Sequence, residues 1–318
     1  MLLPGVLGAA GRAPPPTRAV MVGQARGEDP AALLRAGQRW LAAGNFENAV
    51  RVFRRLTETA PDARAWYYLG VALLESGEFA DAAAALRRAA SLGPPGGNPA
   101  VAHSLGTALL RGGDSGEAVR VLQEAATRHP GNAPILLQLG YAHYTRLEGE
   151  AAREVLGRAV ELSPDDPLAR FYLGMAEAAL GELEPATRSF REAARLAPDL
   201  LDARVALART LSQRGLEDEA RTGYAAVLAA EPAWPPALVG LAMLDLQAGD
   251  AEAAVAGFEA ALAAEPAQRQ ALYNLAAALA RLGRLEEAAE VRERFREAAS
   301  NAPEPGRSLA RTASRPRR

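Results

Sequence analysis

Three histidines are the side chains of this chain best suited to acid–base or metal chemistry: His103, His129 and His143. No acidic residues stand at paired spacing to them, and no His-Glu-x-x-His motif occurs, so we do not expect a metal site. The run Gly113-Asp114-Ser115-Gly116 is superficially similar to a nucleophile elbow but lacks its second spacer residue. The residues with chemical potential therefore do not form a catalytic set.

The amino-acid inventory excludes further reaction classes. All 36 basic residues are arginine, and there is no cysteine. A phosphate loop ending in Gly-Lys and a Ser-x-x-Lys nucleophile need lysine, while thiolate zinc sites and thiol nucleophiles need cysteine. The net charge of −2 argues against a nucleic-acid partner, because such partners are held by clustered positive charge. We expect neither enzymatic activity nor a cofactor.

The sequence repeats every 34 residues, and the structural elements of this repeat must position any functional side chain. Alanines recur at this interval at Ala118, Ala152, Ala186, Ala220, Ala254 and Ala288, and prolines do so at Pro130, Pro164, Pro198, Pro232 and Pro266. Equal intervals of this length are the signature of repeat architectures. The units begin near residues 30, 63, 99, 133, 167, 201, 235 and 269.

Each unit resembles the tetratricopeptide consensus, and the second shows the signature best. Its signature residues are Trp66, Leu69, Gly70, Leu73, Gly77, Phe79, Ala82, Leu86, Ala89 and Pro94. The resemblance covers about 270 residues. It implies an all-α fold, a right-handed α-solenoid (superhelix) of eight helical hairpins over residues 30–299, in which stacked units share one core.

Within a unit, the first helix is expected to end at a glycine, because helices often end in a left-handed residue. The fourth unit has Leu147 at this position and Gly149 two residues later, which predicts a shifted turn at residues 146–149. Asn98 and Asp166 precede prolines and are expected to cap the helices that follow. In the last unit Arg292 replaces a large apolar residue, as suits a terminal unit that faces water.

The segments outside the regular units are less defined by the sequence. Residues 93–99 hold two extra residues and are expected to form an ordered loop, with a hinge as the alternative. Residues 1–29 are interpreted as a disordered leader or, over residues 1–13, as a signal segment without a basic start. The compartment is accordingly the bacterial cytoplasm, or the periplasm if that segment directs export. Residues 300–318 are expected to form a disordered basic tail, and no run of apolar residues is long enough to span a membrane.

The resemblance implies that the first helices line a concave groove. In the family the second, fifth, ninth and twelfth positions of a unit point into it. Carried over by position, the predicted partner-binding residues are Tyr67, Leu74, His103, Leu137, Tyr141, Tyr144, Phe171, Met175, Arg209, Val239, Met243, Leu246 and Tyr273. Aromatic, methionine and arginine side chains are enriched at protein interfaces.

Two ligand modes of the family do not fit these residues. The terminal-carboxylate clamp requires lysine and asparagine, but the chain has no lysine and carries Val71 and Thr107 where asparagine is wanted. The asparagine ladder of the glycosyltransferase members is matched only by Asn274. An apolar extended segment or an amphipathic helix is the more compatible ligand.

The function predicted from the sequence is a non-enzymatic scaffold that binds another protein or peptide in its groove. Two alternatives stay open: the substrate-recognition subunit of an enzyme complex, and an exported assembly factor for envelope structures. End-to-end self-association through an apolar terminal face is a further possibility.

Overall fold

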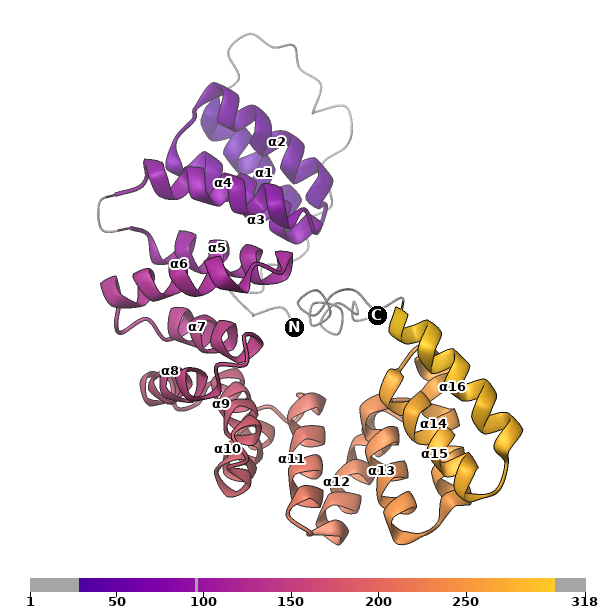
Figure 1. Cartoon of the computed structure of the whole chain (residues 1–318). Helices are drawn as coiled ribbons and strands as arrows, with labels where there is room; N and C mark the ends of the chain where they lie inside the picture. Colours follow the sequence, from indigo (N-terminus) through magenta and orange to yellow (C-terminus); the bar gives the residue numbers. More distant parts are fainter. Residues whose placement is uncertain (1–28, 95–96, 301–318) are drawn as a thin grey trace. The chain divides into compact units, whose positions relative to one another are not determined.

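Helical hairpins make up the chain in the computed structural model, which describes residues 29–94 and 97–300 (Figure 1). Every regular element in these residues is an α-helix, and there are sixteen of them. The all-α solenoid of eight hairpins is thereby confirmed. The first helices of the hairpins begin at Pro30, Ala63, Pro99, Ala133, Pro167, Leu201, Pro235 and Arg269.

The chain divides into two compact units at Leu147. The described part of unit 1 comprises α1 (Pro30–Ala42), α2 (Phe46–Thr59), α3 (Ala63–Ser76), α4 (Phe79–Leu92), α5 (Pro99–Gly112), α6 (Ser115–Arg128) and α7 (Ala133–Thr145). That of unit 2 comprises α8 (Gly149–Leu162), α9 (Pro167–Ala179), α10 (Leu183–Leu196), α11 (Leu201–Gln213), α12 (Glu217–Ala230), α13 (Pro235–Ala248), α14 (Ala251–Ala264), α15 (Arg269–Arg281) and α16 (Leu285–Ser300).

The turns within the hairpins keep one geometry, including the one that lacks glycine. Seven of them place a glycine in the left-handed region, for example Gly113 at φ 87° and Gly181 at φ 78°. In the fourth, Leu147 adopts φ 61° and α8 begins two residues later, as α10 does after Gly181. The predicted shift of this turn was wrong. Moving it would change the register of both helices against their neighbours, so the leucine adopts the disfavoured conformation instead.

The predicted helix caps are confirmed. Oδ1 of Asn98 accepts a hydrogen bond from the backbone N–H of Ala100 at 2.9 Å. Oδ1 of Asp166 accepts one from the backbone N–H of Leu168 at 2.8 Å. Both caps satisfy donors that the first turn of a helix leaves without partners.

The crossing of the two helices in a hairpin depends on small residues. A β-carbon on Gly70 would lie 2.5 Å from Cγ of Leu86, so the side chain of α4 occupies the space left by the missing β-carbon on α3. In the sixth hairpin the first helix carries Ala208 instead, and the glycine, Gly223, stands on the second helix. The close approach is therefore conserved between hairpins although the glycine changes sides.

Neighbouring hairpins join through the third and tenth positions of each first helix, counted from the first residue of that helix. The third positions are buried at Ala65, Val101, Ile135, Ala169, Ala203, Ala237 and Ala271, and the tenth at Ala72, Ala108, Ala142, Ala176, Thr210, Leu244 and Ala278. At the irregular join, α4 and α5 pack against each other.

Several expectations concern residues that the structure does not describe. The predicted leader and basic tail lie outside the described residues except at their inner edges, Asp29 and Ser300. Residues 95–96 of the irregular join lie outside them too. Within the described part of the chain, no helix has the length and apolar character needed to cross a membrane.

Candidate functional site: the inner face of the solenoid

An asymmetry in helix contacts gives each unit an inner and an outer face. In unit 1 α1 contacts α3, α3 contacts α5 and α5 contacts α7, whereas the second helices α2, α4 and α6 do not contact one another in the described residues. In unit 2 the first helices α9, α11, α13 and α15 are likewise in contact in succession, and α8, α10, α12, α14 and α16 are not. Elements that lie closer together line the inside of a curve. The first helices therefore form the inner face of each unit.

Five of the thirteen predicted groove residues are buried in the packing. Leu74, Leu137, Phe171, Val239 and Leu246 are each no more than 9% exposed. Phe171 shows the reason, because it packs in one cluster with Phe190 of its own hairpin and with Ala203 and Ala206 of α11. The next first helix, α11, covers this fifth position, so the Phe171 side chain stabilises the solenoid.

The other eight predicted residues reach the surface. Arg209 and Tyr273 are exposed, and six are partly exposed, namely Tyr67, His103, Tyr141, Tyr144, Met175 and Met243. Only these eight can contact a partner without rearrangement of the hairpins. Their role in binding stays a prediction.

The inner face of unit 1 is aromatic and carries few charged residues. The fifth, ninth and twelfth positions of α1, α3, α5 and α7 carry no acidic or basic residue apart from His103, while the second position of α3 carries the exposed Arg64. Burial lowers the pKa of His103, so this imidazole is neutral at pH 7. Burial likewise raises the pKa of the Tyr141 phenol, so this group stays protonated. At neutral pH this face offers aromatic area and uncharged hydrogen-bonding groups.

A polar contact between α5 and α7 lies among these residues. The Thr107 hydroxyl donates to the backbone carbonyl of His103 at 3.0 Å and accepts from the side-chain amide of Gln138. Gln138 is 3% exposed, and its Oε1 has no partner among the described residues. The sequence analysis did not identify Gln138 or its contact with Thr107.

The inner face of unit 2 has flexible apolar residues and the exposed cation Arg209. Met175 on α9 and Met243 on α13 are partly exposed, and Arg209 stands exposed on α11 between them in the sequence. The Gln270 side-chain amide donates to Sδ of Met243 at 3.4 Å. Thioethers adapt to varied apolar shapes, so this face can fit an apolar ligand that also carries an acid.

Two arginines that the sequence analysis missed connect successive first helices. Nη1 of Arg111 donates to the carbonyl of Leu74 at 3.4 Å, and Nη1 of Arg281 donates to the carbonyl of Leu246 at 2.8 Å. Each stands at the thirteenth position of its hairpin and binds the C-terminal end of the preceding first helix, where cations are favoured. The shared position is the signal that would have identified them.

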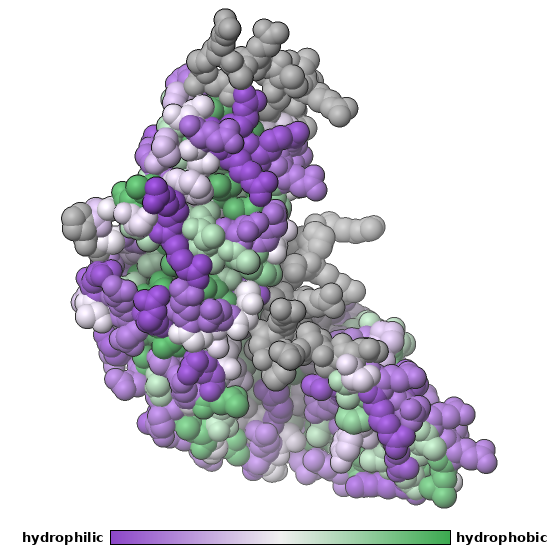
Figure 2. Space-filling model, turned by 45° about the horizontal axis from the view of Figure 1, so that its top comes forward, coloured by the Kyte–Doolittle hydropathy of each residue, from purple (hydrophilic) through white to green (hydrophobic). Residues whose placement is uncertain are grey.

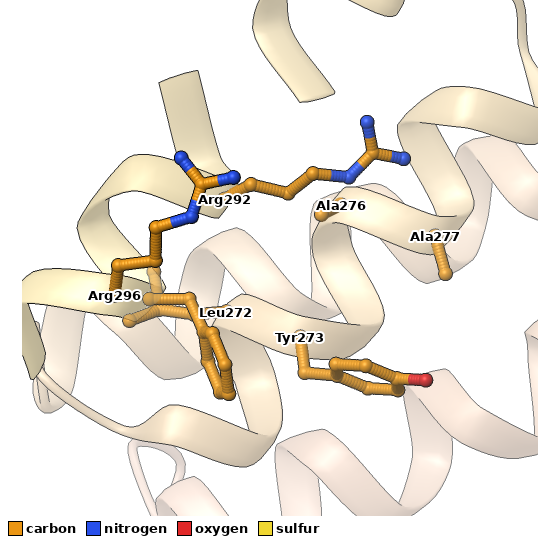
Figure 3. Close-up of a pocket in the computed structure, with 7 residues that line it drawn as sticks. Leu272, Tyr273, Ala276, Ala277, Arg292 and Arg296 are labelled. Atoms are coloured by element: carbon orange, nitrogen blue, oxygen red, sulfur yellow. The ribbon is translucent and has the colours of Figure 1, made fainter. Parts of the chain in front are cut away.

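The last hairpin bears an open pocket of about 400 Å³ on its free side (Figure 3). It is lined by Leu272, Tyr273, Ala276, Ala277, Arg292, Phe295 and Arg296. The rings of Tyr273 and Phe295 lie 6.0 Å apart between centroids. Figure 3 shows Arg292 extended along one side of the pocket and Tyr273 on the other.

The described surface exposes few large apolar side chains. They are Leu92, Leu147, Leu162, Tyr273 and Leu285. In the face shown by Figure 2, hydrophilic residues cover most of the described surface, with smaller hydrophobic patches between them. Within the described residues there is no group of three or more His, Asp or Glu side chains that could hold a metal ion.

Stacked helical hairpins with a curved inner face define a helical-repeat protein of the kind that presents an extended surface. The tetratricopeptide repeat family matches residues 34–97, 109–170 and 239–303. The chain belongs to the tetratricopeptide repeat family, which generally serves as a scaffold for protein–protein interaction.

Solved structures share the fold at low sequence identity. A tetratricopeptide repeat protein from Parabacteroides merdae has a TM-score of 0.64 and 14% identity, over 79% of this chain and 98% of that one. The hetero-tetramer Cut9–Hcn1 of the APC/C has a TM-score of 0.63 and 18% identity, over 77% of this chain and 48% of that one. The present chain thus spans about half the length of that relative.

Human IFIT1, solved as a dimer with m7Gppp-AAAA, has a TM-score of 0.56 and 17% identity, over 86% of this chain and 73% of that one. At these identities the likeness concerns the fold alone. Among curated proteins, none is similar enough in sequence to count as a match.

Proposed function

We propose that this chain is a non-catalytic scaffold that binds a partner protein on the inner face of unit 1. The observation that carries the proposal is the aromatic surface of α3, α5 and α7, which is uncharged at the fifth, ninth and twelfth positions of these helices. Tyr67, His103, Tyr141 and Tyr144 are partly exposed there, and no Arg, Asp or Glu occupies these three positions. Aromatic side chains with a polar tip are those that dominate binding energy at protein interfaces.

The ligand that suits this surface is an apolar extended segment or an amphipathic helix. Neutral imidazole, phenol and hydroxyl groups can bond a peptide backbone, while the rings cover apolar side chains. At the fifth, ninth and twelfth positions, a strongly charged ligand would lose its hydration without gaining an ion pair. The buried, unpartnered Oε1 of Gln138 adds an acceptor close to the same face.

Affinity purification from the native organism, followed by mass spectrometry, tests the proposal. Three baits are compared: the wild type, a double variant and a control. The double variant carries Tyr67→Ala and Tyr144→Ala, two substitutions on the inner face of unit 1. The matched control is Leu92→Ala, which removes a 39%-exposed apolar side chain from the second helix α4. We expect the double variant to lose a specific partner that the wild type and the control retain. Recovery of the same proteins with all three baits would refute binding on this face.

A further inference from the structure

The junctions between hairpins show what the free end of the last hairpin can accept. In the first junction, the ring of Tyr68 on α3 stacks on the ring of Phe53 on α2, with centroids 5.5 Å apart. In another, Gly240 of α13 lies so close to Tyr224 of α12 that a β-carbon would be 2.7 Å from the phenol oxygen. Tyr68 and Gly240 are both at the sixth position of an incoming first helix. Phe53 and Tyr224 are both at the twenty-fourth position of the preceding hairpin.

The last hairpin differs from the others at this twenty-fourth position. Seven hairpins carry a large apolar or aromatic residue there: Phe53, Leu86, Leu122, Leu156, Phe190, Tyr224 and Phe258. The eighth carries Arg292, which is exposed. Because no further helix stacks on α15 in the described residues, Tyr273 is 65% exposed, whereas Val239 at the same position of the preceding hairpin is 3% exposed. The pocket of Figure 3 opens at this free end.

Two arginines line this pocket, and among the described residues only one of them is paired with an acid. Arg296 pairs with Glu293 at 2.5 Å, but Arg292 makes no ion pair with any described residue. Its guanidinium therefore stands at the edge of an apolar pocket, and no carboxylate of the described residues neutralises it. A ligand that fills the pocket with apolar side chains and offers a carboxylate to Arg292 would satisfy both features.

A second copy of this chain does not meet that requirement. If α1 of another copy stacked as a ninth first helix, its sixth position would be Arg35 and its tenth Arg39. Arg35 would then face Arg292, and like charges opposed in an interface are strongly unfavourable. Residues 301–318 of the chain itself carry five arginines and one acid, Glu304, so their charge is unsuitable too.

We propose that the free end formed by α15 and α16 is a second docking surface, which takes an amphipathic helix of another protein that presents a carboxylate to Arg292. This helix lies on α15 and α16 as a first helix lies on the preceding hairpin. It carries small apolar residues at two positions seven apart, matching the third and tenth positions of the internal junctions. An Asp or Glu three residues after the first of them meets Arg292. The surface is separate from the inner face of unit 1.

A designed peptide tests this surface without knowledge of the natural partner. The probe is a fluorescein-labelled peptide with the sequence of residues 268–283 and the change Asn274→Glu at its sixth helical position. A second peptide carries Asn274→Arg. Fluorescence anisotropy with the full chain is expected to show at least about tenfold tighter binding of the first peptide, because one close charge pair supports such a difference.

Variants of the protein then identify the site. Arg292→Glu should reverse the preference, so that the Asn274→Arg peptide binds more tightly. Arg294→Glu, an equal charge change on an exposed residue of the same helix, should leave the preference as in the wild type. Circular dichroism melting checks that both variants are folded.

Three results would overturn the proposal. They are no saturable binding of either peptide, equal affinity for both peptides, or a reversed preference in the Arg294→Glu variant as well as in the Arg292→Glu variant. Sedimentation velocity adds a fourth. A wild-type dimer that Arg292→Glu abolishes would identify a second copy as the occupant. The Tyr67→Ala, Tyr144→Ala double variant should bind the peptide normally, which separates this surface from the inner face.

Discussion

The ring of Phe53 lies directly against the backbone of Gly37, so that a β-carbon on this glycine would be 2.5 Å from Cζ of the ring. Phe53 is fully buried. The contact joins α1 to α2 and recurs between Gly70 and Leu86 and between Gly174 and Phe190. It shows how the hairpins use an absent side chain to bring two helices together.

We predict that Gly37→Ala lowers the free energy of unfolding by about 1–3 kcal/mol, because the methyl group must displace a buried ring. Urea denaturation followed by circular dichroism measures it. Gly157→Ala in α8 is the matched control, since nothing lies within 4 Å of the added β-carbon. Alanine should stabilise that helix by roughly 0.5–1 kcal/mol. Equal effects at the two sites would contradict the packing argument.

At Leu147, whose backbone is left-handed, a change to glycine should stabilise the protein. Leu147→Gly should raise the free energy of unfolding by roughly 1 kcal/mol, because the leucine is 92% exposed and loses little packing when removed. Thermal and urea melts of the variant provide the measurement. Gly113→Ala, at φ 87°, is expected to destabilise by a similar amount. A destabilised Leu147→Gly variant would show that this side chain makes contacts that matter.

Burial of His103 makes the stability depend on pH. Its pKa is lowered from 6.5 by desolvation, so below pH 6.5 the unfolded chain takes up a proton that the folded chain resists. The free energy of unfolding therefore falls as pH drops through 6.5 and stops falling from this cause below the lowered pKa. His103→Gln should lose less stability than the wild type between pH 7 and pH 5 in urea titrations. Parallel losses would contradict the assignment.

Two residues that the sequence predicts to line the groove should differ in the stability lost when each is replaced by alanine. Phe171→Ala is expected to destabilise by about 3–5 kcal/mol, because the ring is only 8% exposed and packs between α9, α10 and α11. Tyr67→Ala, at a partly exposed equivalent position, should cost clearly less while weakening partner binding. Chemical denaturation compares the two. The interpretation fails if the order of the two costs is reversed.

The repeat signature accounts for most of the fold because each hairpin is specified locally. Gly77, Gly113 and Gly181 end their first helices in the expected conformation, and Asn98 and Asp166 cap as predicted. Such features depend on residues a few positions apart, so one period of sequence contains all the information. The exception was Leu147, which adopts the left-handed conformation that favours glycine because the packing register of the whole hairpin requires the turn at this residue.

The sequence by itself determined the all-α solenoid, its hairpins and the absence of lysine and cysteine chemistry, since composition and a 34-residue period are properties of the chain alone. Only the tertiary structure decided which inner positions are free. Phe171 and Tyr273 hold the same place in their hairpins, but α11 covers the first and no described helix covers the second. Whether a side chain meets solvent depends on the neighbouring hairpin, and that information is not contained in one repeat.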